Sequence, residues 1–239
     1  MKFPAALVTL LTVGTLAAAP EPADRPAPRS AWCENFTAVQ AKDKNGVVLP
    51  RNWQIEGGKI GVPMTTCTVT EDKELHAPVL LVHADRSTGG IICNLTGKVD
   101  LTKTPIMRWR WRVLNLPSGG DGRVAAKDDQ PVALYIGTSG WFKKQSLAYR
   151  WENETPKGYE GNTVYGGGIV QVHFITLCDK TAPLGEWRTE SRNVAEDFKK
   201  AYGSVPREFA LSIMGNSQYT KSDTRAEIAF IEFLPAPKK

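Results

Sequence analysis

The sequence predicts an all-β protein: an antiparallel, jelly-roll-like β-sandwich with one short helix. Short apolar runs recur between turn signals along most of the 239 residues, and glycine clusters such as 166–168 separate them. Helical periodicity is nearly absent, whereas arginine and large apolar residues alternate strictly at 107–113. Strict alternation is typical of a β-strand, because successive side chains point to opposite faces of a sheet. Many short strands with glycine-rich turns indicate a sandwich.

The expected strands follow one another along the chain. Each is a short run rich in apolar side chains and bounded by glycine, proline or polar turn residues. We expect strands at 53–56, 79–84, 91–95, 105–114, 132–138, 146–151, 169–177, 208–214 and 227–234.

The expected helix spans 194–202. Asn193 can cap its N-terminus, and Gly203 supplies the left-handed residue that ends it. Acidic residues in the first turn and lysines in the last turn favour the helix dipole. Phe198 and Tyr202 lie one turn apart on one side, so we expect them to fix the helix to the sandwich.

The N-terminal segment 1–19 has the composition of a secretory signal peptide. One lysine precedes an apolar run at 5–19 that is too short to span a bilayer, which takes about 20 residues. The composition of residues 20–30 predicts a proline-rich disordered leader. We expect residues 31–239 to form a single β-sandwich domain. The sequence therefore predicts a periplasmic or secreted protein with no membrane span.

Four cysteines in an exported chain are more consistent with two disulfides than with a metal site. The spacing contains no CxxC or CxxH pattern, so no metal is expected at these residues. The four are Cys33, Cys67, Cys93 and Cys178. Three pairings are open, and the pairing of Cys67 with Cys93 is favoured because these residues lie on strands expected to be neighbours.

Antiparallel pairing of neighbouring strands would match their faces across one sheet. The core face would then hold Trp109, Trp111, Leu134, Ile136, Leu147, Tyr149, Trp151, Val170, Val172 and Phe174. The opposite face would hold Arg108, Arg110, Arg112, Tyr135, Arg150, Gln171 and His173. This second set predicts a ligand-binding face.

The chemistry of that face suits an acidic glycan. Arginine binds carboxylates through two parallel hydrogen bonds, while tyrosine and histidine donate or accept protons. A net charge of +5 agrees with an acidic partner. The alternative is structural: the arginines pair with acidic side chains such as Glu152 or Glu190. Both interpretations stay open at the level of sequence.

Two loops add candidate ligand contacts. Trp141, in a loop flanked by glycine and lysines, can stack on a sugar ring at the rim of the site, or fold back over the edge of the sandwich. The acidic loop at 121–123 and the Asp128–Asp129 pair can offer oxygen ligands to a structural calcium ion, although the spacing fits no EF-hand. Solvated turn residues explain these acids more simply, and no other cofactor is expected.

Two short motifs resemble those of the jelly-roll alginate lyases. They are Gln171-Val172-His173 and the segment 188–192, an Arg-x-Glu-x-Arg pattern. Their order is reversed relative to that family, and its Tyr-x-Lys-Ala-Gly motif is missing. The resemblance implies that glutamine and histidine, with an arginine and a tyrosine, neutralise a uronate and abstract its proton.

A longer series of residues resembles a bacterial exported family, the domain of unknown function 3047. The resemblance runs from Ile106 to Phe233. The matching positions, in order, are Trp109, Trp111, Pro117, Asp121, Asp128, Asp129, Tyr149, Trp151, Trp187, Glu190, Arg192, Asn193, Val194, Asp197 and Gly203. Members carry an acidic turn where this chain has 215–218, Gly-Asn-Ser-Gln. The resemblance implies a β-sandwich similar to carbohydrate-binding and lyase folds, and no established activity.

These observations predict an exported protein that binds carbohydrate, with an acidic polysaccharide preferred and no nucleic acid partner. A polysaccharide lyase is the enzymatic alternative: Gln171 and an arginine would neutralise the uronate, and His173 or Tyr135 would be the base. The third alternative is a non-catalytic envelope scaffold that binds another protein. A glycoside hydrolase needs two facing carboxylates, which the basic face does not offer.

Overall fold

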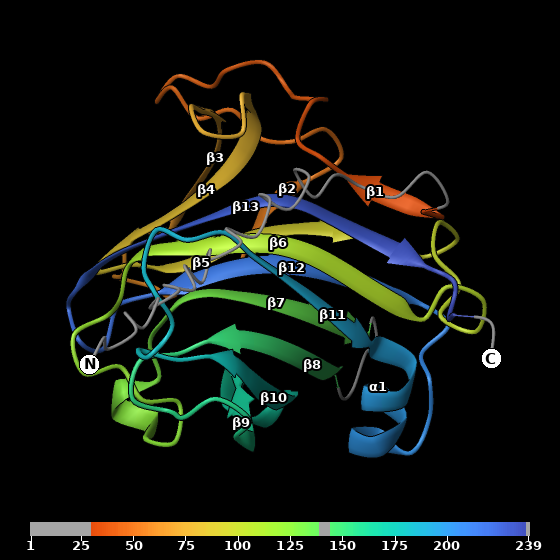
Figure 1. Cartoon of the computed structure of the whole chain (residues 1–239). Helices are drawn as coiled ribbons and strands as arrows, with labels where there is room; N and C mark the ends of the chain where they lie inside the picture. The colour runs from red at the N-terminus through yellow and green to blue at the C-terminus, as the bar shows by residue number, and fades with distance from the viewer. Residues whose placement is uncertain (1–29, 139–143, 238–239) are drawn as a thin grey trace, which may run out of the picture.

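The protein is a two-sheet β-sandwich with one short α-helix (Figure 1). This computed structural model describes residues 30–138 and 144–237. The six-stranded sheet has the order β11 (Arg188–Asn193), β6 (Ile106–Asn115), β13 (Asp223–Leu234), β4 (Ala77–Asp85) and β3 (Thr66–Asp72), and β1 (Trp32–Glu34) also pairs with β13. The all-β sandwich fold predicted from the sequence is confirmed.

The seven-stranded sheet forms the other layer. Its order is β2 (Gln54–Glu56), β5 (Thr88–Asn94), β12 (Phe209–Asn216), β7 (Gln130–Thr138), β8 (Lys144–Trp151), β10 (Val170–Cys178) and β9 (Glu160–Tyr165). Two 3-10 turns, η1 (Ala125–Lys127) and η2 (Gly166–Gly168), lie in its connections. All pairings between the named strands are antiparallel except that of β8 with β10.

The two sheets enclose one aromatic core. Trp109 from β6 stacks on Tyr149 from β8, with 5.3 Å between ring centroids, and Trp111 packs edge-on against Trp151 at 5.7 Å. All four side chains have no solvent exposure. Burial of an aromatic side chain of about 200 Å² at about 25 cal/mol per Å² contributes on the order of 5 kcal/mol before entropy is counted. The alternation at 107–113 therefore directs both tryptophans of β6 to the inner face of the sheet, where they pack between the two sheets.

The helix α1 (Val194–Tyr202) forms at the predicted residues. The Asn193 side chain accepts a hydrogen bond from the Glu196 amide at 3.2 Å, and Gly203 adopts a φ of 79° at the C-terminal end. Phe198 is buried, and the Tyr202 hydroxyl donates to backbone carbonyls of β8 or β10. The helix therefore closes one end of the sandwich.

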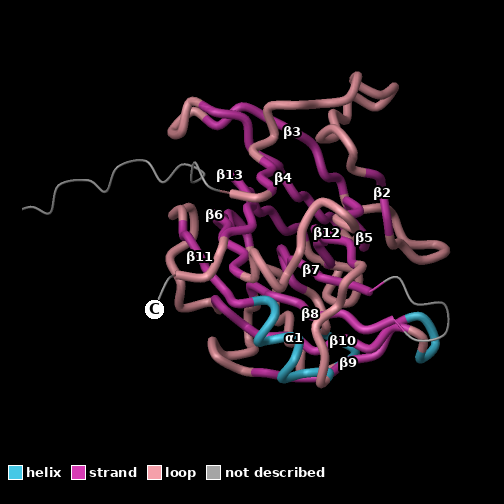
Figure 2. The backbone as a smooth tube through the Cα atoms, turned by 90° about the vertical axis from the view of Figure 1, so that its right-hand side faces the viewer, coloured by secondary structure: helices cyan, strands magenta, loops and turns pink. Residues whose placement is uncertain are grey.

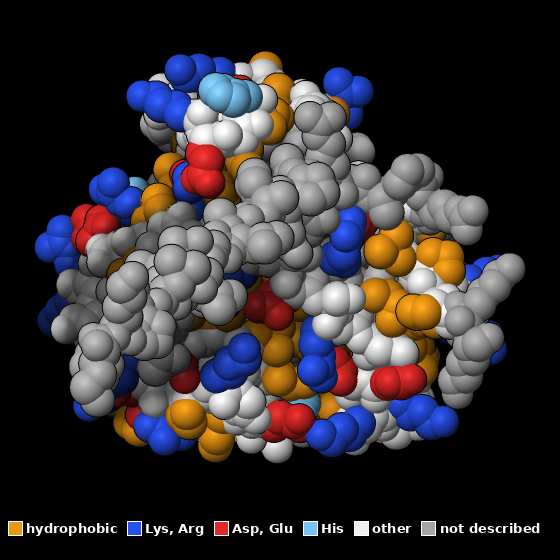
Figure 3. All heavy atoms as spheres, viewed as in Figure 1, with side chains coloured by type: hydrophobic (Ala, Val, Ile, Leu, Met, Phe, Trp, Pro, Cys, Tyr) orange, Lys and Arg blue, Asp and Glu red, His pale blue; other side chains and the backbone are white. Residues whose placement is uncertain are grey.

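The arginine row of β6 lies on the outer face of the six-stranded sheet and is ion-paired across strands. Arg108 pairs with Glu232 at 2.6 Å, and Arg112 pairs with Glu227 at 2.6 Å; both carboxylates come from the directly opposite positions of β13. Arg112 also binds Asp72 and contacts the ring of Trp187. Figure 3 shows both basic and acidic side chains on the part of this face that is coloured by residue type. The structural alternative therefore accounts for these two arginines.

The predicted face matching is wrong for β10. This strand runs parallel to β8, so Val172 lies opposite Ser146, and Phe174 lies opposite Ala148, on the face turned away from the core. Gln171 and His173 consequently point to the other face of the strand. The prediction failed because alternation fixes the faces within one strand but not the register with its neighbour, and β10 pairs with β8 so that Val172 and Phe174 share a face with Ser146 and Ala148.

The predicted disulfides are absent, and all four cysteines are free thiols. Cys67 lies on β3 of the six-stranded sheet and Cys93 on β5 of the seven-stranded sheet, so the favoured pair does not come from neighbouring strands. Cys33 is exposed, and the other three are buried. In this fold the buried cysteines act as small apolar core residues.

Two expectations lie outside the described residues. They are the signal peptide at 1–19, together with the leader up to residue 29, and the candidate stacking residue Trp141. In the part of the chain that the structure describes, no helix has the length and apolar character needed to cross a membrane.

Candidate functional site

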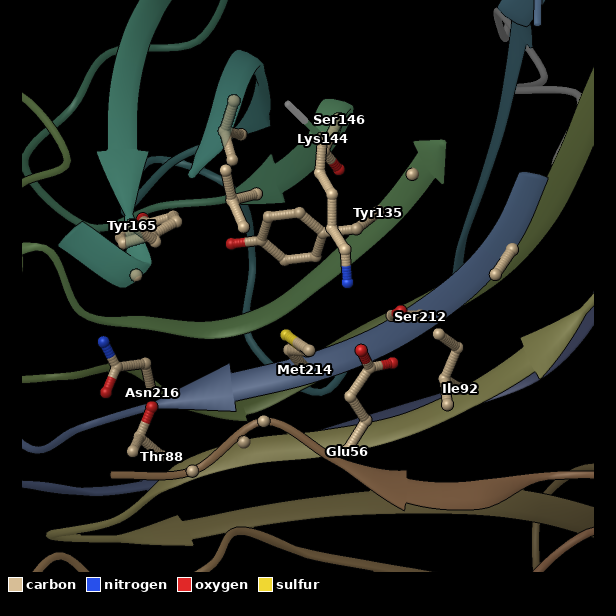
Figure 4. A pocket seen from close by; sticks show the side chains of 18 of the residues that line it. Glu56, Thr88, Ile92, Tyr135, Lys144, Ser146, Tyr165, Ser212, Met214 and Asn216 are labelled. Atoms are coloured by element: carbon tan, nitrogen blue, oxygen red, sulfur yellow. The ribbon is translucent and has the colours of Figure 1, made fainter. Parts of the chain in front are cut away.

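A groove crosses the open face of the seven-stranded sheet, the face turned away from the core. Its cavity volume is about 1040 Å³. In Figure 2, β2 at one end of the sheet and β8, β9 and β10 at the other extend to the same side of β5, β12 and β7. Side chains from both ends and from the middle strands point into the groove (Figure 4). Curvature of the sheet thus turns one face into a candidate binding site.

Small side chains on β7 deepen the floor of the groove. Along this strand Leu134 and Ile136 are buried in the core, so Tyr135 and Gly137 point to the open face. A Cβ atom at Gly137 would have the Ser146 Oγ atom as its nearest neighbour, at 3.6 Å, which is an ordinary contact. The fold therefore tolerates a side chain at Gly137, and its absence leaves space for a ligand.

Uncharged polar side chains share the lining of the groove with apolar side chains and glycines. The amide side chains are Asn52, Gln54, Asn94, Gln130, Gln145, Asn216 and Gln218, and the hydroxyls include those of Thr88, Thr138, Ser146 and Ser212. Tyrosine rings at 135, 165 and 219 add apolar surface. Among the described lining residues the charged ones are Glu56, Lys59 and Lys144. The groove therefore offers many hydrogen-bond donors and acceptors and little charge.

Glu56 is the carboxylate of the groove. It projects from β2 toward the middle of the site (Figure 4). Its Oε2 atom is buried and has no hydrogen-bond partner. Burial raises the pKa of Glu56, against the opposing effects of the Lys144 ammonium and the Ser212 hydroxyl. A buried carboxylate oxygen without a donor is unfavourable, so a ligand that donates to it gains free energy.

A buried charge cluster lies behind the two tyrosines of the groove. The Arg150 guanidinium has no solvent exposure and donates to Asp128 at 2.8 Å and to Glu152 at 3.3 Å. It also donates to the hydroxyls of Tyr165 at 2.7 Å and Tyr135 at 3.4 Å. These contacts hold both tyrosine hydroxyls away from the ligand space and present the rings to it.

The cluster shifts the pKa values of its members. Burial raises the pKa of Glu152 to about 7, even though Arg150 opposes the shift. Burial also raises the pKa of Tyr135. For Arg150 burial acts in the lowering direction, but the surrounding tyrosine and carboxylate oxygens raise its pKa well above the ordinary value. Arg150 is therefore a permanent cation whose two terminal nitrogens donate to the protein, while its buried Nε atom has no partner.

The structure does not bring the predicted ligand-binding residues together. Arg108, Arg110 and Arg112 lie on the six-stranded sheet, with the Arg110 guanidinium 6.0 Å from the centre of the Trp187 ring. Arg150 is buried beneath the groove of the other sheet. Of the residues predicted to form the ligand-binding face, Tyr135 lines the groove, whereas none of the four arginines does.

The remaining pair of that set, Gln171 and His173, lies on the opposite face of β10 from the groove. His173 Nδ1 is 3.0 Å from the Asn162 amide oxygen, and its Nε2 is 3.4 Å from Glu160. The segment 188–192 belongs to β11 in the other sheet. The two motifs that resemble alginate lyase motifs are therefore not on one surface.

The predicted calcium ligands are engaged in other contacts. Asp121 accepts hydrogen bonds from Arg123 and Thr155, and Asp128 binds Arg150 and Tyr165. The neighbouring Asp129 accepts backbone N–H groups of the turn after β12. Within residues 30–138 and 144–237, no group of three or more His, Cys, Asp or Glu side chains is arranged to hold a metal ion.

Sequence reasoning missed the main polar residues of the groove: Glu56, Lys144 and Ser212. A signal was available on β12, where Ala210, Ser212, Met214 and Asn216 alternate with buried Phe209, Leu211 and Ile213. Together with the small residues on β7, this alternation marks a sheet face that is neither fully apolar nor solvated. Such a face is typical of the floor of a groove.

Comparison with known proteins identifies the family of the chain. Residues 51–232 match the family described as "Protein of unknown function (DUF3047)". The matched region covers more than half of the sequence. The chain belongs to the DUF3047 family. The resemblance noted from Ile106 to Phe233 is therefore confirmed, and the family region begins further toward the N-terminus. No curated protein matches this DUF3047 chain.

Solved structures similar to this DUF3047 protein are β-sandwich domains at low identity. They include the CBM22-1 xylan-binding domain of Paenibacillus barcinonensis Xyn10C, with 12% identity, a TM-score of 0.40, and coverage of 90% of this chain and 100% of that domain. A native family 12 xyloglucanase from Bacillus licheniformis has 9% identity and a TM-score of 0.45, with 83% of this chain and 99% of the enzyme covered. Likeness at this level identifies neither a ligand nor a reaction for this chain.

Proposed function

We propose that this DUF3047 protein binds a carbohydrate chain in the groove of its seven-stranded sheet. The observation that carries the proposal is the lining: amide and hydroxyl groups along a cavity of about 1040 Å³, with tyrosine rings held in place from behind. Sugars present hydroxyls that both donate and accept, and apolar ring faces that stack on aromatic side chains. Ligand pockets of about 300–1,000 Å³ are usual for small molecules, so this groove has room for several sugar units.

The charges of the groove favour an acidic chain over a basic one. Lys59 and Lys144 contribute two ammonium groups, and Glu56 contributes one carboxylate. We therefore place the preference for an acidic polysaccharide, first inferred from the arginine row, in this groove. We also retain export as part of the proposal, because the segment 1–19 has the composition of a signal peptide.

Binding fits the groove better than cleavage does. A glycoside hydrolase uses two carboxylates that flank the scissile bond, and Glu56 is the single carboxylate among the described lining residues. A lyase needs a base that is active near neutral pH, whereas burial raises the pKa of Tyr135. His173, the other predicted base, lies on the opposite face of β10. We therefore propose a binding protein.

Affinity gel electrophoresis of the mature protein through acidic and neutral polysaccharides tests the proposal. We expect retardation in wild type and its loss in Gly137→Val, because the new side chain fills the groove floor at a position with room for it. The matched control is Ser191→Val, a valine placed at an exposed strand position of the other sheet. It should bind like wild type.

The Arg110→Ala variant separates the groove from the basic face of the six-stranded sheet. If the groove binds the glycan, each polysaccharide retards Arg110→Ala as much as wild type, when each protein is compared with its own mobility in a gel without polysaccharide. Retardation that disappears in Arg110→Ala and persists in Gly137→Val would refute the groove and return the site to the arginine row. Equal mobility of wild type in all gels would refute carbohydrate binding.

A further inference from the structure

Two opposite charges face one another across the groove. The Glu56 side chain extends from β2 and the Lys144 side chain from β8, and the two point toward one another (Figure 4). In the sheet, β5, β12 and β7 lie between these two strands. The two side chains are close enough for the Lys144 charge to oppose the rise in the pKa of Glu56, yet the Oε2 atom of Glu56 has no hydrogen-bond partner. Lys144 is exposed and Glu56 is partly exposed, so a ligand placed between them can contact both side chains.

The Glu56 side and the Lys144 side of the groove, here called its two walls, favour different hydrogen-bonding groups on a ligand. The Glu56 Oε2 atom is buried without a donor, so its wall requires a ligand group that donates hydrogen bonds. The exposed Lys144 ammonium donates three hydrogen bonds and accepts none, so its wall favours an acceptor, best an anion. Ser212 and Tyr135 lie on the floor between them. The groove is therefore polarised across its width.

One class of sugar unit matches this polarity. A hexuronate in its pyranose form carries a carboxylate at C5 and, at the other side of the ring, the hydroxyls of C2 and C3. The carboxylate only accepts hydrogen bonds, and the hydroxyls can both donate. An amino sugar would satisfy Glu56 but present no anion to Lys144, and it would bring a further positive charge into the groove. A neutral hexose would leave the Lys144 ammonium without an anionic partner.

We infer that the middle of the groove is a subsite for a hexuronate unit, which lies across the groove with its carboxylate on Lys144 and its 2,3-diol on Glu56. The inference rests on the proposed function and assigns a ligand class and orientation to the same groove. In this subsite, tight binding requires both a free carboxylate and a free 2,3-diol on the sugar unit, and the two requirements are independent. Esterification of the acid and acetylation of the diol therefore each weaken binding through a different wall.

The test measures the binding of polygalacturonate, alginate and polyglucuronate to the full mature chain by isothermal titration. Each polymer is used as the free acid, the methyl ester and the 2,3-O-acetyl derivative, and a neutral glucan completes the set. For at least one polymer, wild type should bind the free acid about tenfold more tightly than either derivative, as expected for loss of a charge-assisted contact.

Two variants distinguish the walls. Lys144→Gln should weaken binding of the free acid about tenfold and leave the methyl ester unchanged, so that the two affinities become equal. Glu56→Gln should weaken the free acid and the ester alike and leave the acetylated polymer unchanged. A merely structural role of either residue would weaken all three forms together. The matched controls, Lys199→Gln on α1 and Glu71→Gln on β3, lie on exposed positions outside the groove and should change nothing.

The outcomes separate this inference from the proposed function. If wild type binds the esters or the neutral glucan as tightly as every free acid, the hexuronate subsite is refuted while carbohydrate binding stands. If acetylation has no effect and Glu56→Gln binds like wild type, the assigned orientation is refuted. Absence of binding to every polymer would overturn the proposed function itself, together with the subsite.

Discussion

Glu152 lies in the buried cluster behind the groove, where its protonation state affects the stability of the fold. Burial raises its pKa from 4.5 to about 7, so between these pH values the folded state holds a proton that the unfolded chain releases. Stability contributed by a group with a raised pKa is present at low pH and is lost as the pH rises through the folded-state pKa. Deprotonation leaves Glu152 and Asp128 as two carboxylates on one arginine.

The variant Glu152→Gln mimics the protonated form and should show this effect directly. We expect its free energy of unfolding, relative to wild type, to rise by on the order of 2 kcal/mol between pH 5 and pH 8. Urea denaturation at a series of pH values measures the difference, and contributions from all other titrating groups cancel in it. Glu154→Gln, a surface carboxylate paired with Lys180, serves as the control. A difference that is constant with pH in Glu152→Gln would contradict the assignment.

At the scale of elements, the cap of α1 connects a single side chain to the closure of the sandwich. Asn193→Ala removes the hydrogen bond to the Glu196 amide and should destabilise the protein by about 1 kcal/mol, or lower Tm by about 2–4 °C. Thermal unfolding followed by circular dichroism measures the shift. Asn193→Asp keeps a capping oxygen and should retain nearly the wild-type Tm. If aspartate is as destabilising as alanine, the cap is not the cause.

The sequence predicted interior strands better than edge strands. The apolar runs at 105–114, 132–138 and 208–214 correspond to β6, β7 and β12, which have neighbours on both sides. The strands β3, β9 and β11 were not expected, and all three lie at sheet edges with much polar or exposed surface. An edge strand has one unpaired side and needs few apolar residues, so hydrophobic periodicity detects it poorly.

The candidate site was harder to predict than the fold because it depends on which strands become neighbours. Alternation fixed the parity of Trp109 and Tyr149 correctly, since both point to the core. It could not show that Arg108 and Arg150 belong to different sheets, or that β10 runs parallel to β8. Nor could it show that Glu56, on an edge strand, faces Lys144 across a curved sheet. These relations arise from topology and curvature, which a linear pattern does not contain.

At the scale of the whole molecule, the two sheets hold together through burial without covalent cross-links. One continuous cluster of buried apolar residues reaches from Phe36 to Phe233 and includes side chains of both sheets. A domain of about 200 residues buries roughly 70% of the surface that its unfolded chain exposes, which is enough for a stable fold without disulfides. The four free thiols are consistent with this source of stability.

The urea midpoint of the protein should therefore be the same with and without a reductant. All four thiols should react with a thiol reagent in denaturant, whereas in the native state the three buried ones should not. Cys33 is an exposed residue, but its sulfur is partly shielded from water. This desolvation, together with the nearby Glu232 and Glu34, raises the pKa of Cys33 to about 11, so little thiolate is present at pH 8 and the thiol should react slowly. A midpoint that falls when reductant is added, or fewer than four thiols in denaturant, would show that a disulfide forms and that the fold described for these cysteines must rearrange.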